Sequence, residues 1–362
     1  MTSPARTDDL QVLLDAQYGL ATQSQLEGYG YPRSRVRHFV DAGQWTVVLR
    51  GVYSLTSGPL TRPMILMAAL LYGGGSALLS HWTAGEEWRM VRLDESQPVH
   101  ITVPYGESAK SQAPTRIRPP AGGDKPVPLV GAVRHPGVVV HRSRAHAHLA
   151  VDGLFPRTSK AVTAIDLAVG ASSARAARLS LVSSVTNAGI RLIDIRQCLD
   201  VREPRRYRKA LDDAVAVLAD GVQSVLEYHY AIDVEQAHGL PTARRQGPVK
   251  VDGRTLFEDV DYSDTGVPLI VRLDGRATHS MREVAFRDRR RDNAAELADR
   301  PRLVYGFEEV GDDPCGVARE VETVLVREGW RRERLNLCAG CESVRPPTTD
   351  EGAGPPRPSV RA

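Results

Sequence analysis

Apolar residues near the N-terminus recur at the spacing of amphipathic helices in three short segments. Leu10, Leu13 and Leu14 share one face of the first segment, as a helix that packs on a core requires. Thr22 and Gln25 stand three residues apart, which is the pattern of a capping box at the start of a second helix. The first two helices are therefore predicted to be short and separated by a break.

The third segment carries Val36, Phe39 and Val40 at helical spacing, so these side chains are expected to pack inward. The residues that follow alternate well enough for two short strands, with Arg50-Gly51 at the turn between them. Three helices followed by a hairpin predict a winged helix-turn-helix in residues 1–60. In that fold the third helix enters the major groove and the hairpin contacts the DNA backbone.

The outer face of this third helix is rich in arginine although residues 1–60 are neutral overall. Guanidinium groups crowded at the start of a recognition helix suit contacts to phosphates and guanines. The alternative is a solvated helix face with no ligand. The candidate DNA-binding residues are Arg33, Ser34, Arg35, Arg37 and His38 of the helix and Arg50 of the hairpin.

The same residues resemble the N-terminal domain of the AbiEi family, the antitoxins of type IV toxin–antitoxin systems. The resemblance covers about the first 55 residues and is most specific at Gly43, Trp45 and Arg50-Gly51-Val52-Tyr53. It implies a domain that binds double-stranded DNA and autoregulates its operon. It also implies a cognate toxin as a partner.

Residues 61–170 predict a central α+β unit. Residues 76–88 have the pattern of a helix, and residues 98–104 and 137–143 have the pattern of strands. This order is similar to the region that follows the winged helix in many AbiEi-like actinobacterial proteins. Residues 171–221, rich in arginine and alanine, are predicted to be a helical connector.

The cysteines supply only part of a metal site, and the spacing of the histidines indicates none. Cys338 and Cys341 have zinc-knuckle spacing, but a structural zinc site needs four ligands. Cys315 and a histidine are the candidates for the other two, and no spacing links them to this pair. Zinc is therefore not expected as a cofactor. Six histidines lack helical spacing beside a carboxylate and are expected to be surface or core residues: His81, His100, His135, His141, His146 and His148.

Residues 222–335 predict a third unit in the order helix, hairpin, strand, helix, strand, helix. Asp252-Gly253 is a strong hairpin turn, and the apolar run 267–273 has the pattern of a buried strand. The charged residues 281–300 can form the following helix. This order is the core of a restriction-endonuclease-like fold, so the whole chain is predicted to be an α+β multidomain protein with an α/β endonuclease-like domain at its C-terminal end.

Two strand ends of this unit carry carboxylates. Phe257, Asp259 and Asp261 are predicted to share one strand face, because side chains alternate along a strand. Asp274 ends the next strand, and His279 follows it closely. Carboxylates that converge with a histidine can hold a divalent metal on oxygen ligands with a base nearby, as phosphodiester cleavage requires. Whether Asp259 or Asp261 is the ligand stays open.

Residues 224–330 also resemble an uncharacterised domain related to the very-short-patch-repair (Vsr) endonucleases. The motifs are Ser-x-Leu-Glu at a helix start, Gly-Leu-Pro, Gln246, Asp-Val-x-Tyr, and a strand that ends Leu-Asp-Gly-Arg-x-x-His. The resemblance implies that Asp259, with Asp274, binds Mg²⁺, that Glu227 assists and that His279 is the base. Arg272 stands where many relatives have Glu, and an arginine there would repel a metal.

Composition narrows the function without deciding it. The 362 residues carry a net charge of +3 and 42% hydrophobic residues, so a packed core is expected and any DNA-binding surface must be local. The sequence shows no signal-peptide pattern and no apolar run that could span a membrane. Four cysteines do not form a disulfide framework, so a cytoplasmic protein is expected. Residues 336–362 are predicted to be disordered.

These patterns favour a DNA-binding regulator that resembles AbiEi antitoxins and carries a degenerate endonuclease-like domain. The alternative is an active Mg²⁺-dependent DNA endonuclease targeted by the winged helix, for which Mg²⁺ would be the cofactor. A third interpretation is a scaffold that binds a partner protein. Arg272 favours the regulator, whereas His279 together with Asp259 and Glu227 favours the nuclease.

Overall fold

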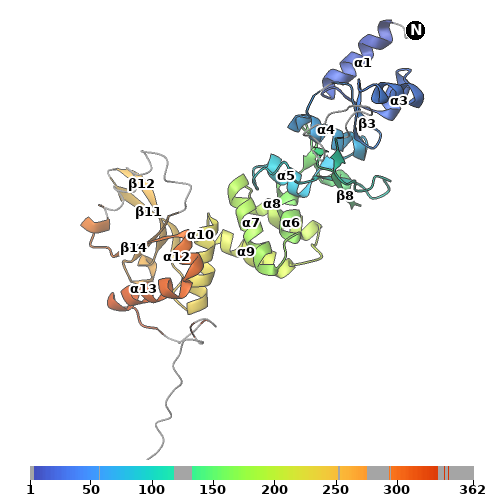
Figure 1. The fold of residues 1–362 in the computed structure, drawn as a ribbon. Coiled ribbons are helices and arrows are strands. Elements are labelled where there is room, and N and C mark those ends of the chain that lie inside the picture. Colours follow the sequence, from blue (N-terminus) through green and yellow to red (C-terminus); the bar gives the residue numbers. More distant parts are fainter. Residues whose placement is uncertain are drawn as a thin grey trace, which may run out of the picture. The chain divides into compact units, whose positions relative to one another are not determined.

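The structure, a computed structural model, describes residues 4–56, 58–117, 133–251, 253–274 and 295–332, together with Asn293, Cys338 and Cys341. The chain forms two compact units, Met1–Val215 and Ala216–Ala362, and their boundary falls within helix α9 (Arg208–Ala219) (Figure 1). No helix in the described part of the chain is both long and apolar enough to cross a membrane.

The first unit begins with the predicted three helices and hairpin. Thr22 and Gln25 form the predicted capping box, with the Gln25 amide donating to Thr22 Oγ1 at 3.2 Å. A short strand that the sequence did not predict, β1, lies between the first two helices and pairs with β3, giving an antiparallel sheet of order β1-β3-β2. The elements are α1 (Pro4–Ala16), β1 (Leu20–Thr22), α2 (Gln23–Gly28), α3 (Arg33–Asp41), β2 (Thr46–Leu49) and β3 (Val52–Ser54).

A small apolar core holds these elements together. Val36 of α3 is buried against Leu10, Ala21 and Leu26, as its spacing predicted. Phe39 is only half-buried, and its ring stacks on Trp45 with the centroids 4.4 Å apart. The aromatic contact fixes the end of α3 against the start of the hairpin, so the face opposite Val36 is turned to solvent.

The rest of the first unit contains a five-stranded sheet, of order β8-β5-β4-β10-β9, a two-stranded antiparallel sheet of β6 and β7, and helices. The predicted strands at 98–104 and 137–143 are confirmed as β5 and β8, which are parallel. The elements between β3 and α9 are α4 (Arg62–Gly73), β4 (Leu78–Leu79), α5 (His81–Glu87), β5 (Val99–Pro104), β6 (Thr115–Arg116), β7 (Val133–His135), β8 (Val138–Ser143), η1 (His146–His148), β9 (Ala150–Val151), β10 (Arg157–Thr158), α6 (Lys160–Val169), α7 (Ala174–Ala188) and α8 (Leu192–Val201).

The helix predicted over residues 76–88 is wrong in its first part. Leu78 and Leu79 form strand β4 and pair with Thr102 and Ile101 of β5, and only the residues from His81 onward are helical. Both leucines are buried, because the strand lies inside the sheet. Tertiary pairing therefore overrode the helical pattern of the segment.

The second unit is a four-stranded sheet of order β11-β12-β13-β14, in which only β13 and β14 are parallel. Helices α10, α12 and α13 lie on one side of it (Figure 1). The predicted helix over 281–300 falls mostly outside the described residues. The elements are α10 (Val225–His229), the π-helical segment η2 (Tyr230–Gln236), β11 (Arg244–Val251), β12 (Arg254–Asp261), η3 (Ser263–Thr265), β13 (Ile270–Asp274), β14 (Arg302–Gly306), α12 (Phe307–Asp312) and α13 (Pro314–Arg327).

The helix formed by α10 and η2 contributes three side chains to the core of the second unit. Leu226, Tyr230 and Val234 are in the core and Tyr228 is also buried, whereas Val225 and Ile232 are only half-buried. The first three stand four residues apart, so they follow one row along the helix surface. The tyrosines and charged residues beside this row need hydrogen-bond or ion-pair partners, and other residues of the core provide these partners.

A buried polar network links this helix to the sheet. Glu235 and Arg245 form an ion pair in which both side chains are only 4% exposed. The Tyr262 hydroxyl donates to Glu235 Oε1 at 2.7 Å and also lies 3.0 Å from the Tyr230 hydroxyl. Because a buried charge is costly unless it is paired and hydrogen-bonded, these contacts explain how polar side chains are accommodated in the core.

Candidate DNA-binding and nuclease sites

The outer face of α3 presents exposed polar side chains. Arg33, Ser34, Arg37 and His38 are all exposed, while Val36 between them is 1% exposed. The nearest acids are loosely placed: Arg33 Nε lies 4.0 Å from Glu27 Oε1, and Arg37 Nε lies 3.7 Å from an exposed aspartate one turn later. Exposed ion pairs contribute little, so DNA phosphates can displace them.

Arg35 and Arg50 are placed differently from the other predicted DNA-binding residues. The Arg35 guanidinium lies over the Tyr31 ring, 4.7 Å from its centroid, so it lies on the aromatic side of α3. Arg50 is exposed at the hairpin turn, where Gly51 adopts φ +75°, and its backbone amide donates to Gln112 Oε1 at 3.0 Å. The hairpin tip is thus held by its backbone while the Arg50 side chain faces solvent.

Glu227, the predicted assisting acid, is buried at the start of α10. Its carboxylate accepts hydrogen bonds from the Gln223 amide at 2.9 Å, from Ser224 Oγ at 3.3 Å and, at 3.5 Å, from Gln246 Nε2 of β11. Burial raises the pKa of Glu227, and the negative charge of Asp259 raises it further against the opposing hydrogen bonds. The structure therefore brings Glu227, Gln246 and Asp259 together.

Asp259 stands on β12 beside the end of β13. Its Oδ2 accepts a hydrogen bond from the Leu273 amide at 3.0 Å, and Asp274, which is exposed, is the next residue along that strand. In the register set by the pairs on either side, Gln246 lies opposite Asp259. Gln246 has φ +50°, a conformation that a non-glycine residue adopts at a cost and that often marks a functional site.

Asp261 does not share the environment predicted for it with Asp259. Its carboxylate is 3% exposed and accepts hydrogen bonds from Ser263, from Arg244 at 2.8 Å and from Arg300 at 2.7 Å. Burial alone would raise the pKa of Asp261, but these bonds and cations together lower it. Asp261 therefore anchors the turn after β12, and of the two alternatives Asp259 is the better placed to bind a metal.

Arg272 pairs with a carboxylate that the sequence did not single out. Its Nε lies 3.3 Å from Glu258 Oε2, and the two side chains are 4% and 2% exposed. The arginine is thus engaged by Glu258 of the neighbouring strand. His279, the predicted base, lies outside the described residues, so its role stays a prediction.

Three histidines that the sequence treated as separate residues lie together in the first unit. His100 Nδ1 is 3.1 Å from His141 Nε2, and the rings of His81 and His141 stack with centroids 3.6 Å apart. Burial, followed by the neighbouring histidines, lowers the pKa of His141 to about 3, and the pKa of His81 is also lowered to about 3. They come from α5, β5 and β8, so no sequence spacing could have shown the cluster.

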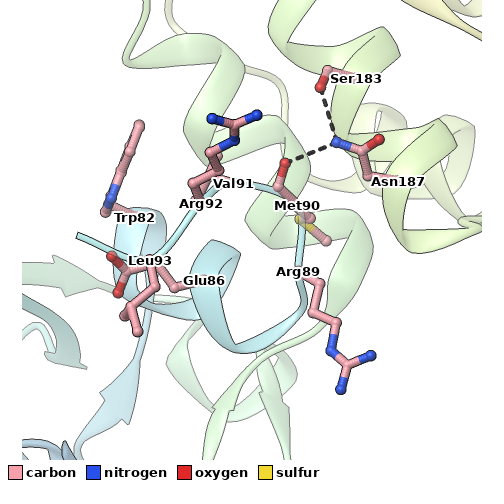
Figure 2. A pocket seen from close by; sticks show the side chains of 9 residues that line it. All are labelled: Trp82, Glu86, Arg89, Met90, Val91, Arg92, Leu93, Ser183 and Asn187. Carbon is pink, nitrogen blue, oxygen red and sulfur yellow. Dashed lines mark hydrogen bonds between the residues drawn. The ribbon is translucent and has the colours of Figure 1, made fainter. Parts of the chain in front are cut away.

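A cavity of about 600 Å³ opens between α5 and α7 of the first unit (Figure 2). Asn187 of α7 donates to the Met90 carbonyl and to Ser183 Oγ, both at 3.2 Å, and Trp82 and Glu86 of α5 line the other side. None of the predicted site residues lines it. The DNA-binding and nuclease predictions therefore do not depend on this cavity.

Comparison with known proteins supports the N-terminal prediction. Residues 8–56 match the family described as transcriptional regulator, AbiEi antitoxin. This match confirms the resemblance seen in the first 55 residues and covers α2, α3 and the hairpin. A search of curated proteins finds no match. The resemblance of the C-terminal unit to Vsr endonucleases stays a prediction.

Proposed function

We propose that this protein is a DNA-binding regulator that resembles AbiEi antitoxins and reads DNA through α3. The observation that carries the proposal is the exposed face of α3, on which Arg33 and Arg37 stand one turn apart. This face belongs to the segment that matches the AbiEi regulators. Helix α3 occupies the position of the recognition helix in a winged helix-turn-helix.

The geometry of α3 divides its arginines by role. Arg33 and Arg37 lie on the solvent face, with only loose acidic neighbours, so their guanidinium groups are available for guanine or phosphate contacts. Arg35 is held over an aromatic ring and is better suited to support the helix than to reach a base. Arg50 on the hairpin is placed for a backbone phosphate.

Binding of the protein to the DNA upstream of its own gene tests the proposal. The double variant Arg33→Ala, Arg37→Ala should weaken binding by about 1–3 kcal/mol for each arginine that hydrogen-bonds to a base, measured by fluorescence anisotropy at fixed salt. The matched control is Arg196→Ala, Lys209→Ala, which removes the same charge from exposed positions on α8 and α9.

The control separates a local contact from the effect of net charge. If both double variants bind as weakly as each other, the α3 face is not the reading surface. If neither differs from the native protein and circular dichroism shows an intact fold, this chain does not bind the tested DNA through α3. A cognate toxin, which the resemblance implies, would be sought by co-purification with products of neighbouring genes.

A second candidate function, DNA cleavage, is favoured by the cluster of Glu227, Gln246 and Asp259. Asp259 and Asp274 are the residues that would hold Mg²⁺, which would supply Lewis-acid stabilisation of the charge that develops on a phosphodiester. Glu227 lies beside Asp259 and could orient a water molecule. Arg272, which argued for a degenerate site, has Glu258 as a partner.

Nicking of supercoiled plasmid with Mg²⁺ or Mn²⁺, with a chelator as a control, tests this second function. Asp259→Asn should abolish any genuine activity, whereas Asp264→Asn, an identical change at a more exposed carboxylate after β12, should leave it intact. Absence of cleavage by the native protein supports the degenerate domain. Cleavage that survives Asp259→Asn would point to a contaminant.

A further inference from the structure

Four potential metal ligands converge in the second unit, away from the predicted nuclease residues. One ligand atom from each of His238, Cys315, Cys338 and Cys341 lies within 4.8 Å of the others. In the described part of the chain, no other group of three or more histidine, cysteine or acidic side chains is gathered in this way. The four come from the last turn of the helix that contains η2, the first turn of α13 (Figure 1), and a Cys-x-x-Cys pair.

One ring nitrogen of His238 is hydrogen-bonded within the protein, and the other is left to bind a ligand. It is 5% exposed, and its Nδ1 donates to the Val234 carbonyl at 2.9 Å. Because a carbonyl can only accept, this bond places the ring proton on Nδ1 and leaves a lone pair on Nε2. Nε2 is buried, and no hydrogen-bond partner among the described residues reaches it.

An unsatisfied buried nitrogen is costly, so its presence needs a reason. Metal-binding histidines donate one ring N–H to a backbone carbonyl or carboxylate, which orients the other nitrogen toward the ion. His238 has this arrangement, with Nε2 among the three cysteine sulfurs.

The cysteines supply the remaining ligands. Cys315 Sγ lies 3.3 Å from Cys338 Sγ, and the Cys341 amide donates to Cys338 Sγ at 3.4 Å. Cys315 lies in the first turn of α13. Zinc–sulfur bonds of about 2.3 Å in a tetrahedron place sulfurs about 3.8 Å apart, so only small side-chain adjustments are needed.

We propose that His238, Cys315, Cys338 and Cys341 bind one zinc ion in a structural site. Thiolates favour zinc over the hard cations Mg²⁺ and Ca²⁺. Four protein ligands fill a tetrahedral shell and leave no position for water or substrate, which distinguishes structural from catalytic zinc. The three thiols release their protons when the ion binds. The expectation of little zinc rested on an incomplete ligand set, and His238 completes it.

The proposed ion would fasten the Cys338–Cys341 pair to the body of the second unit. It joins this pair to α13 through Cys315 and to the helix of the buried Glu235 network through His238. Because the site is assembled only in the folded chain, the binding energy of zinc adds to folding stability. Removing the ion should therefore destabilise this unit.

Inductively coupled plasma mass spectrometry measures the zinc content of the full-length protein, purified without added metal. The native protein should carry close to one zinc per chain, and Cys341→Ser and His238→Ala should lose most of it. Cys198→Ser is the matched control, because Cys198 is the one cysteine of the chain that is not a proposed ligand, and it lies on α8 of the first unit. It should keep its zinc.

A rescue variant separates ligation from folding. His238→Cys should retain zinc, because a four-cysteine site also binds it, whereas a residue needed only for packing would not be replaced by cysteine. Substitution of Co²⁺ into the native protein should give the intense thiolate-to-metal charge-transfer absorption of a tetrahedral sulfur-rich site. Loss of this absorption in His238→Ala and its retention in Cys198→Ser would support the assignment.

The main rival is a disulfide between Cys315 and Cys338. After denaturation in chelator without reductant, the zinc-bound protein should expose four reactive thiols, the number of cysteines in the chain. Only two reactive thiols, with no zinc in the native sample, would establish the disulfide and overturn the proposal. Four thiols with no zinc and no Co²⁺ absorption would also overturn it.

Discussion

Lowering the pH from 7 to 5 is expected to destabilise the first unit, because its fold keeps several imidazoles neutral. Burial lowers the pKa of His81 and His141 to about 3 and that of His135 to about 4, compared with 6.5 for an exposed histidine. Below pH 6.5 the unfolded chain therefore takes up protons that the folded chain does not. Stability from these groups is complete above pH 6.5 and is lost as the pH falls.

The size of the effect follows from these pKa values. Each imidazole that stays neutral only in the fold costs about 1.4 kcal/mol per pH unit below 6.5, or roughly 2 kcal/mol by pH 5. Asp166 acts in the opposite direction, because burial, opposed by Arg202, raises its pKa to about 6. As the pH falls, Asp166 takes up its proton in the folded state before it does so in the unfolded chain. This uptake stabilises the folded state by about 1 kcal/mol. Partial exposure of His81 and His141 reduces the contribution of these histidines. We therefore expect the free energy of unfolding to fall by roughly 3 kcal/mol between pH 7 and pH 5.

Urea unfolding at pH 7, 6 and 5, followed by tryptophan fluorescence, measures this loss. Trp88 reports on the first unit, since its Nε1 donates to the Thr158 carbonyl at 2.8 Å. His141→Gln should flatten the pH dependence by about 2 kcal/mol. His148→Gln, at an exposed position in η1, should not change it. Equal slopes for the native protein and both variants would refute the assignment of the pH dependence to the buried cluster.

Three substitutions test contacts elsewhere. Thr22→Ala removes the Oγ1 that caps α2 and should cost about 1 kcal/mol, with Ser as a tolerated control, in chemical denaturation. Tyr262→Phe withdraws a hydrogen bond from buried Glu235 and should cost about 1–3 kcal/mol, whereas Tyr29→Phe should cost little. Arg272→Glu should destabilise the second unit by roughly 3–5 kcal/mol, because it would place a second carboxylate against buried Glu258. We do not expect it to create cleavage, and nicking by a stable Arg272→Glu protein would contradict this prediction.

Elements coded by nearby residues could be predicted from the sequence. The capping box at Thr22, the proline before α3 and the Arg50-Gly51 turn act within a few residues, so the order of helices and hairpin was accessible. Strand β1 was missed because its three residues form a strand only by pairing with β3. Leu78 and Leu79 were misassigned for the same reason.

Sites built from distant segments were harder to predict. Cys338 and Cys341 were recognisable by their spacing, but nothing in the sequence distinguished His238 from the other histidines, because its selection depends on how its helix packs beside α13. Likewise Asp259 and Asp261 are equivalent on an ideal strand, and only the contacts of Arg244 and Arg300 with Asp261 separate them.

The charged side chains of the second unit divide into two kinds, and this division bears on function. Arg245 with Glu235 and Arg272 with Glu258 are buried pairs of opposite charge. Glu227 of α10 differs, because burial raises its pKa and the negative charge of a second carboxylate, Asp259 of β12, raises it further. A fold selected only for stability would avoid this arrangement, so perturbed carboxylates of this kind are typical of sites that bind a cation or do chemistry. The φ of +50° at Gln246, which lies opposite Asp259, adds a second local cost. The Glu227–Asp259 region is therefore the part of the second unit at which the proposed DNA cleavage is best tested.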